Sequence, residues 1–189
     1  VTDYTVTGHQ QTNAGNYEIK ITLSGNYEIA ANTPDLSYTI AQATNGWKDD
    51  KKPTISGGVY NGSAYAANTD GCTALFGTFN TKYYKVEGDV ETALDGAPTN
   101  AGSYRVRFVG GVSTNYTQLN DYIDFTITPK AITPQLSTEN LVYKTTAQTV
   151  TASTAEGVTD FTVTCENATV EGKSISVTNA GEYTVVFTL

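Results

Sequence analysis

Residues 99–106, TNAGSYRV, decide the fold, because the chain contains this segment three times with little change. The other copies are TNAGNYEI at residues 12–19 and TNAGEYTV at residues 178–185. Asn100 follows Asn13 by 87 positions, and Asn179 follows Asn100 by 79. That spacing is typical of a small β-sandwich domain and too long for one coil of a solenoid. The sequence therefore predicts tandem domains of one kind.

Each copy leads into a predicted strand with one apolar face. Alternate positions hold apolar or aromatic residues, as expected of a strand with one face in a core: Tyr17, Ile19, Ile21 and Leu23; Tyr104, Val106 and Phe108; Tyr183, Val185 and Phe187. The preceding Asn-Ala-Gly predicts a turn, since Gly tolerates positive φ and Asn bonds to its own backbone. Ile19, Val106 and Val185 stand where an antibody domain places its second cysteine, so the predicted core has no disulfide.

A turn followed by a strand whose first inward residue is Tyr is similar to the tyrosine corner of immunoglobulin folds, in which the phenol bonds to backbone upstream. We therefore predict a structural tyrosine corner at Tyr17, Tyr104 and Tyr183.

A second alternating strand is predicted after the first two copies, at residues 36–40 and 122–127. The third copy reaches Leu189 before any such strand, and the first begins shortly after Val1. We expect residues 1–43 to be the C-terminal part of one repeat, 45–130 a complete repeat, and 131–189 a repeat without its last strand. Open strand edges at both ends predict that the fragment either self-associates, with the strand from about Leu36 to Ala41 as a candidate donor, or has poorly ordered ends.

Two joints between these domains are predicted to differ in stiffness. Pro129 and Pro134 bracket the second joint and restrict its backbone, whereas the longer joint at residues 41–52, which carries Trp47 and five successive charges, is expected to be looser.

Composition supports an all-β class and excludes some partners. Thirteen Tyr, six Phe and only 16% charged residues favour strands over helices. The net charge of −8 argues against nucleic acid, which is bound by clustered Lys and Arg. No apolar run approaches the roughly 18 residues of a membrane span, so no membrane insertion is expected.

The middle copy as a whole resembles bacterial immunoglobulin-like tandem repeats, including the MBG type, of Gram-positive cell-surface proteins. The residues that carry the resemblance lie along the whole of it: Asn45-Gly46-Trp47, Pro53-Thr54-Ile55, Val59-Tyr60-Asn61-Gly62, Phe76-Gly77-Thr78, Tyr83-Tyr84, residues 95–104, Asn115-Tyr116 and Phe125-Thr126-Ile127. A related variant is suggested in the third copy by residues 143–150 and 163–172. The resemblance implies tandem immunoglobulin-like β-sandwich domains, an extracellular, cell-wall-associated location, and a role as stalk, spacer or adhesin module. It implies no catalytic residues.

Candidate sites for other chemistry are few. His9 is the single histidine, which excludes a Ser-His-Asp triad or a multi-histidine zinc site formed by these residues alone. Acidic pairs such as Asp121 with Asp124 could serve a glycosidase, but solvated turns and protected strand edges explain them better. Calcium at a domain junction is the best metal guess, yet no EF-hand-like loop is present, and we predict no metal and no cofactor. Cys72 and Cys165 fall in different predicted domains, so we expect no bridge between them.

Exposed aromatic residues are the remaining candidates for ligand binding. Aromatic faces with polar tips suit sugar rings, and five residues are candidates: Trp47, Tyr60, Tyr65, Tyr83 and Tyr84. Core and interdomain packing is the competing explanation, since alternation places some of them inside. Two hypotheses follow. The first is a non-catalytic structural repeat unit, and the second a module that binds carbohydrate or a host surface protein.

Overall fold

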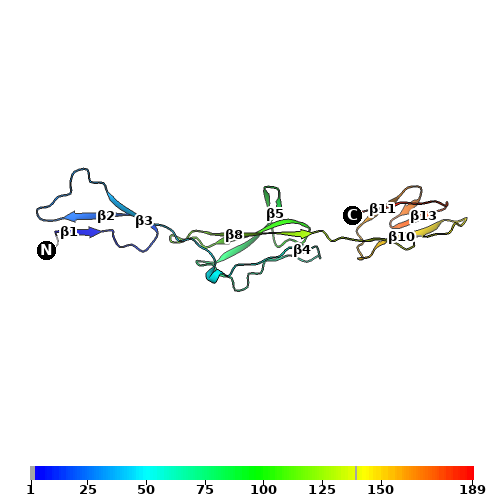
Figure 1. Cartoon of the computed structure of the whole chain (residues 1–189), viewed down its shortest axis with the longest axis horizontal. Helices are drawn as coiled ribbons and strands as arrows, with labels where there is room; N and C mark the ends of the chain where they lie inside the picture. The colour runs from blue at the N-terminus through cyan, green and yellow to red at the C-terminus, as the bar shows by residue number, and fades with distance from the viewer. Residues whose placement is uncertain (1–2, 139) are drawn as a thin grey trace. The chain divides into compact units, whose positions relative to one another are not determined.

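The chain is nearly all β (Figure 1), which confirms the all-β part of the predicted fold class. The computed structural model describes residues 3–138 and 140–189. Within those residues the one helical element is a short 3-10 turn, η1, at Lys48–Asp50, and there is no α-helix. The chain forms two compact units, Val1–Pro129 and Lys130–Leu189, each with sheets of its own.

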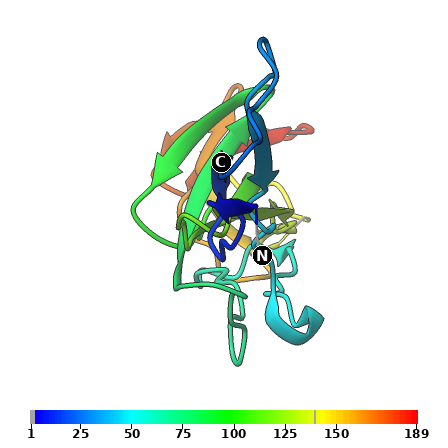
Figure 2. The same cartoon turned by 90° about the vertical axis from the view of Figure 1, so that its left-hand side faces the viewer.

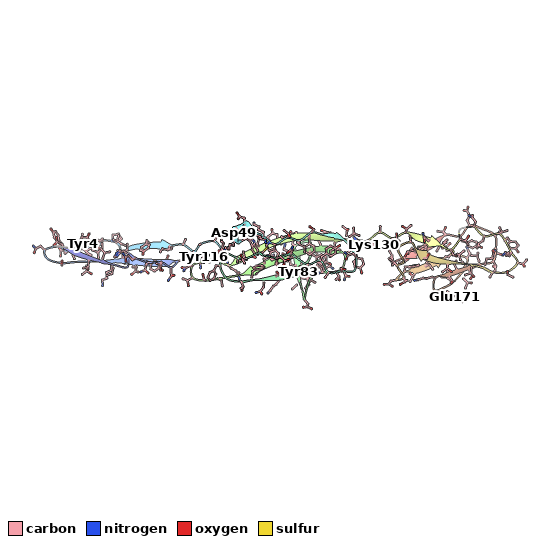
Figure 3. All side chains as sticks on the ribbon, turned by 90° about the horizontal axis from the view of Figure 1, so that it is seen from below. Tyr4, Asp49, Tyr83, Tyr116, Lys130 and Glu171 are labelled. Carbon is pink, nitrogen blue, oxygen red and sulfur yellow. The ribbon has the colours of Figure 1, made fainter. Side chains whose placement is uncertain are left out.

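Unit 1 begins with a three-stranded antiparallel sheet in the order β1-β2-β3. Its strands are β1 (Tyr4–Thr7), β2 (Gly15–Leu23) and β3 (Leu36–Ile40). Exposure alternates along β2, as the apolar pattern predicted. The half-buried residues share one face: Val6, Tyr17, Ile19, Ile21, Leu23, Tyr38 and Ile40. No residue of this sheet is fully buried, and Figure 3, where Tyr4 is labelled, shows a single layer of strands.

The rest of unit 1 is formed around a five-stranded sheet in the order β4-β8-β7-β5-β6. Figure 2 shows its long strands in green. The strands are β4 (Gly58–Val59), β5 (Phe79–Glu87), β6 (Val90–Leu94), β7 (Gly102–Gly110) and β8 (Leu119–Thr128). All pairs are antiparallel except β4 with β8, which run parallel. The alternation predicted for β7 is confirmed, because Tyr104, Val106 and Phe108 are all buried.

The core of this part lies between the inner face of the sheet and the irregular segment 43–75. Trp47 is 7% exposed and packs edge-on against Phe79 and Phe108. Asn45 is 6% exposed. The prediction of a loose joint at residues 41–52 is therefore wrong for its central residues. Because the indole of Trp47 and the amide of Asn45 are both buried, the segment that carries them belongs to the core.

The strands that follow the first two TNAG turns pair in one register. Gly15 lies opposite Ile40, and Tyr17 lies opposite Tyr38. In the five-stranded sheet Gly102 lies opposite Ile127, and Tyr104 lies opposite Phe125. Both aromatic pairs are in ring contact, with centroids 5.5 and 5.6 Å apart. The similar sequences thus form similar local structures.

Unit 2 contains two sheets around one small core. Its strands are β9 (Pro134–Leu136), β10 (Gln148–Thr154), β11 (Thr162–Cys165), β12 (Thr169–Glu171), β13 (Ser174–Val177) and β14 (Val185–Thr188). One sheet has the order β12-β13-β10-β9, and the other pairs β11 with β14. Side chains from both sheets share the core: Ala152, Phe161, Val163 and Ile175. Cys165 lies in this unit and Cys72 in unit 1, and both thiols are free.

Candidate functional site

The tyrosine of each TNAG segment holds its own turn closed. The hydroxyl of Tyr104 donates a hydrogen bond of 2.7 Å to the carbonyl oxygen of Asn100. Tyr17 and Tyr183 donate in the same way to the Asn four residues upstream, at 2.8 and 2.9 Å. The middle copy favours glycine at position 102, because the backbone has a φ of +157° there and a Cβ would lie 3.2 Å from the Tyr104 hydroxyl oxygen, a tight contact. The segment is thus a closed turn with its ring packed against the backbone.

Tyr104→Phe is expected to lower the free energy of unfolding of unit 1 by about 1 kcal/mol, the usual net value of one hydrogen bond. The substitution removes the hydroxyl that donates to the Asn100 carbonyl oxygen. The ring, which is 4% exposed, keeps its packing because phenylalanine has the same ring. Urea denaturation monitored by tryptophan fluorescence would measure the loss. Tyr183→Phe is the matched control, because its hydrogen bond lies on the surface of unit 2 and leaves unit 1 untouched. A Tyr104→Phe midpoint equal to that of the original chain would contradict this role.

The outer face of the five-stranded sheet carries a cluster of charged and aromatic side chains. We define the outer-face cluster as Tyr84, Glu91, Arg105, Arg107, Tyr122 and Asp124. The guanidinium of Arg105 donates two bonds of 2.6 and 2.7 Å to Asp124 and one of 2.7 Å to Glu91. Arg107 donates two further bonds to Glu91, at 2.6 and 2.9 Å. Two arginines from β7 thus link β6 and β8 across the sheet.

These contacts keep both carboxylates ionised. Hydrogen bonds from Arg107, with a smaller share from Arg105, hold the pKa of Glu91 below its ordinary value. The hydrogen bonds of Arg105 lower the pKa of Asp124 in the same way. A glycosidase general acid needs a raised pKa, which is the opposite shift. Glu91 and Asp124 are therefore arranged as partners of arginine.

Tyrosine rings lie beneath the arginines of the outer-face cluster. The guanidinium carbon of Arg105 lies 4.1 Å from the centre of the Tyr122 ring, and that of Arg107 lies 5.7 Å from it. Tyr122 is still 50% exposed. Tyr122 and the two arginines were not among the residues predicted from the sequence to bind a ligand, because only the strand register brings β6, β7 and β8 together. The cluster offers aromatic, cationic and anionic groups on one face of the sheet.

The five aromatic residues predicted as ligand candidates are not brought together. Trp47 is in the core, where its indole N–H donates a 2.7 Å hydrogen bond to Asp121. Tyr65 and Tyr83 are packed against the core, and the hydroxyl of Tyr83 (Figure 3) accepts a hydrogen bond from the Ala67 amide. Only two of the five offer outward surface: Tyr60, which is 41% exposed, and Tyr84, which belongs to the outer-face cluster.

The remaining polar candidates lie apart from one another. His9 is exposed in the loop between β1 and β2. The oxygens of Asp121 and Asp124 have different partners, the indole of Trp47 and the guanidinium of Arg105. In the described part of the chain no group of three or more His, Cys, Asp or Glu side chains is arranged to hold a metal ion.

Unit 2 contains a hollow near a strand edge. A groove of about 590 Å³ lies between the residues around Leu141 and the last TNAG segment. Apolar residues from three strands of the four-stranded sheet, β9, β10 and β13, line it: Leu136, Val150, Ile175 and Val177. The sequence predicted that the repeat at residues 131–189 lacks its last strand, but it did not predict a cavity, because a cavity depends on how the two sheets are spaced.

Comparison with known proteins adds no identification. No protein-family model matches the chain, and no curated protein matches it. In residues 3–138 and 140–189, no helix has the length and apolar character needed to cross a membrane.

Proposed function

We propose that this chain is a non-catalytic extracellular segment of tandem immunoglobulin-like repeats, acting as a stalk, spacer or adhesin module of a bacterial surface protein. The observation that carries the proposal is the repeated turn. Three TNAG segments each close through a tyrosine hydroxyl on an asparagine carbonyl, as a tyrosine corner does. A chain that repeats one structural unit is suited to setting a distance.

The side chains of unit 1 support the same proposal. Its most elaborate hydrogen bonds, those of Asn45, Trp47 and the outer-face cluster, connect elements of the fold to one another. Such bonds stabilise a framework. A cell-wall-associated location remains part of the proposal, and it rests on the resemblance to Gram-positive surface repeats.

Small-angle scattering tests the spacer role. A compact protein of this length would have a radius of gyration of about 16 Å. We expect a clearly larger value and a distance distribution with a long tail, because domains joined in series spread the mass along one direction. A variant with Gly-Ser inserted after Pro129 serves as a flexible-joint control. A radius of gyration at the compact value would contradict the spacer role.

A second candidate function is binding of a carbohydrate or a host surface protein, and the outer-face cluster favours it. Tyr122 is half exposed and lies on the same face of the sheet as two arginines and two carboxylates. A glycan array probed with the whole chain would decide between the candidates. Reproducible binding that Tyr122→Ala removes and Tyr60→Ala leaves intact would replace the spacer role with this one.

A further inference from the structure

The first TNAG segment makes a second set of contacts, with the loop that joins β7 to β8. The backbone amide of Ala14 donates a hydrogen bond of 2.6 Å to the side-chain oxygen of Asn115. The side-chain nitrogen of Asn115 donates in turn to the side-chain oxygen of Asn13, at 2.9 Å. These partners lie 101 and 102 positions away along the chain, so one carboxamide joins the three-stranded sheet to the five-stranded part of unit 1.

The tyrosine of the segment does not explain why Asn and Ala recur before the glycine. Tyr17 bonds to the backbone carbonyl of Asn13, a group that any residue at position 13 would provide. The contact with Asn115 uses the side chain of Asn13 itself. Ala14, whose amide takes part, is half-buried, whereas Ala101 at the matching position of the middle copy is exposed. The Asn-Ala pair of the turn is therefore suited to receiving a side chain from outside the turn.

The loop that carries Asn115 is shaped by its own serine. The hydroxyl oxygen of Ser113 accepts hydrogen bonds of 3.1 Å from the backbone amides of both Asn115 and Tyr116. The same spacing of Ser, Asn and Tyr occurs after β2, in SGNY at residues 24–27. A loop that presents an asparagine thus recurs after the strand of a TNAG segment, as the TNAG turn itself recurs.

The segment that connects the two sheets holds this loop from another side. The backbone amide of Ala43 donates a 2.8 Å hydrogen bond to the Asn115 carbonyl oxygen, and the Ala43 carbonyl oxygen accepts one of 3.0 Å from the Thr117 amide. β3 ends at Ile40, which lies opposite Gly15, so the connecting segment leaves the three-stranded sheet beside the TNAG turn. The loop is therefore attached both to the turn and to the connection that starts next to it.

We propose that the TNAG turn is a docking site for the following repeat, and that Asn115 is the residue that recognises it. The partner is the Ser-x-Asn-Tyr loop of that repeat, whose carboxamide binds the Ala14 amide and the Asn13 side chain together. Adjacent domains joined by a single connection move relative to one another, and a second attachment restricts that motion. The inference rests on the proposed tandem repeats and adds how neighbouring repeats keep a fixed angle.

Amide hydrogen exchange in the whole chain, resolved by NMR, tests the contact. Asn115→Ala removes both side-chain bonds, so the Ala14 amide should exchange at least about tenfold faster, equivalent to about 1.4 kcal/mol of local protection. Thr114→Ala is the matched control, because Thr114 is an exposed residue of the same loop. Equal exchange rates of the Ala14 amide in the two variants would overturn the proposal.

Asn13→Ala distinguishes docking from the tyrosine corner. It keeps the backbone carbonyl that accepts from Tyr17 and removes the side-chain oxygen that accepts from Asn115. Residual dipolar couplings of the whole chain should then show reduced alignment of the three-stranded sheet with the five-stranded sheet, and Asn115→Ala should reduce it further. Asn100→Ala is the control, because Asn100 lies at the opposite end of β7 from the Asn115 loop.

Couplings that fit one alignment tensor for both sheets in all of these variants would overturn the proposal. So would equal losses of alignment in Asn13→Ala and Asn100→Ala. The scattering test of the spacer role measures overall size, whereas these measurements report the joint between two sheets of unit 1. The two proposals can therefore fail separately.

Discussion

Val106→Asp is expected to abolish the cooperative unfolding transition of unit 1. Val106 has no exposed surface and lies at the centre of β7, between β5 and β8. The core around it contains apolar and aromatic residues such as Tyr104, Phe108 and Ile127. An ionised carboxylate there must lose its hydration or take up a proton, and either cost is several kcal/mol. That is comparable with the whole stability of a typical domain.

Tryptophan fluorescence measures this effect directly. Trp47 is the single tryptophan, and it packs against Phe108, which belongs to the same core as Val106. Unfolding should shift its emission to longer wavelength before any denaturant is added. Val90→Asp is the matched control, since Val90 is 63% exposed and the same substitution there should leave the midpoint nearly unchanged. An unchanged melting temperature for Val106→Asp would show that β7 does not direct this face inward.

Asn45→Ala should destabilise unit 1 by roughly 3 kcal/mol, because one buried side chain closes two loops. The amide nitrogen of Asn45 donates to the carbonyl oxygens of Phe76 and Gly111, at 3.0 and 2.9 Å. Its side-chain oxygen accepts from the backbone amides of Gly46 and Phe76. Alanine would leave four backbone groups without this partner at a site that is 6% exposed.

Asn45→Asp changes the hydrogen bonding of the side chain at position 45 and keeps its size. The aspartate is almost isosteric, but its carboxylate would face two carbonyl oxygens to which it cannot donate. We expect a loss at least as large as that of alanine, measured by urea denaturation at neutral pH. Asn61→Ala is the control, because the side chain of Asn61 accepts one exposed hydrogen bond, from Ser63. If Asn45→Ala and Asn61→Ala shifted the midpoint equally, the Asn45 side chain would not hold the two loops.

Period-two patterns made β2, β7 and β8 predictable from the sequence, because each strand carries its inward residues at alternate positions. Tyr17 and Tyr104 stood out because their segments recur. The sequence pattern could not decide between core packing and ligand binding for Trp47, which the structure places in the core. The segment 43–75 has little regular structure, and it is held by isolated bridges such as that between Trp47 and Ala74 and by side-chain bonds from Asn45. Such contacts leave no periodic signal.

The outer-face cluster was unpredictable for another reason. Glu91 lies 14 positions before Arg105, and Tyr122 lies 17 positions after it. The three side chains meet only through the register of β6, β7 and β8. A shift of one residue in either pairing would turn these side chains to the other face. The groove in unit 2 was not predicted, because it depends on the spacing of two sheets.

The parallel pairing of β4 with β8 has a mechanical consequence. A pull on the C-terminal side of unit 1 would reach β8 through Pro129, whereas a pull on the N-terminal side would reach β4 first. Beside this pair, the backbone amide of Tyr60 donates a 2.8 Å hydrogen bond to the carbonyl oxygen of Thr128. Tension along the polypeptide would pull these two strands in opposite directions along their own axes. The hydrogen bonds between β4 and β8 would then be loaded together in shear, so they would have to break together and could not break one after another. The force at which unit 1 unfolds would then be governed by the rate at which the hydrogen bonds between β4 and β8 break.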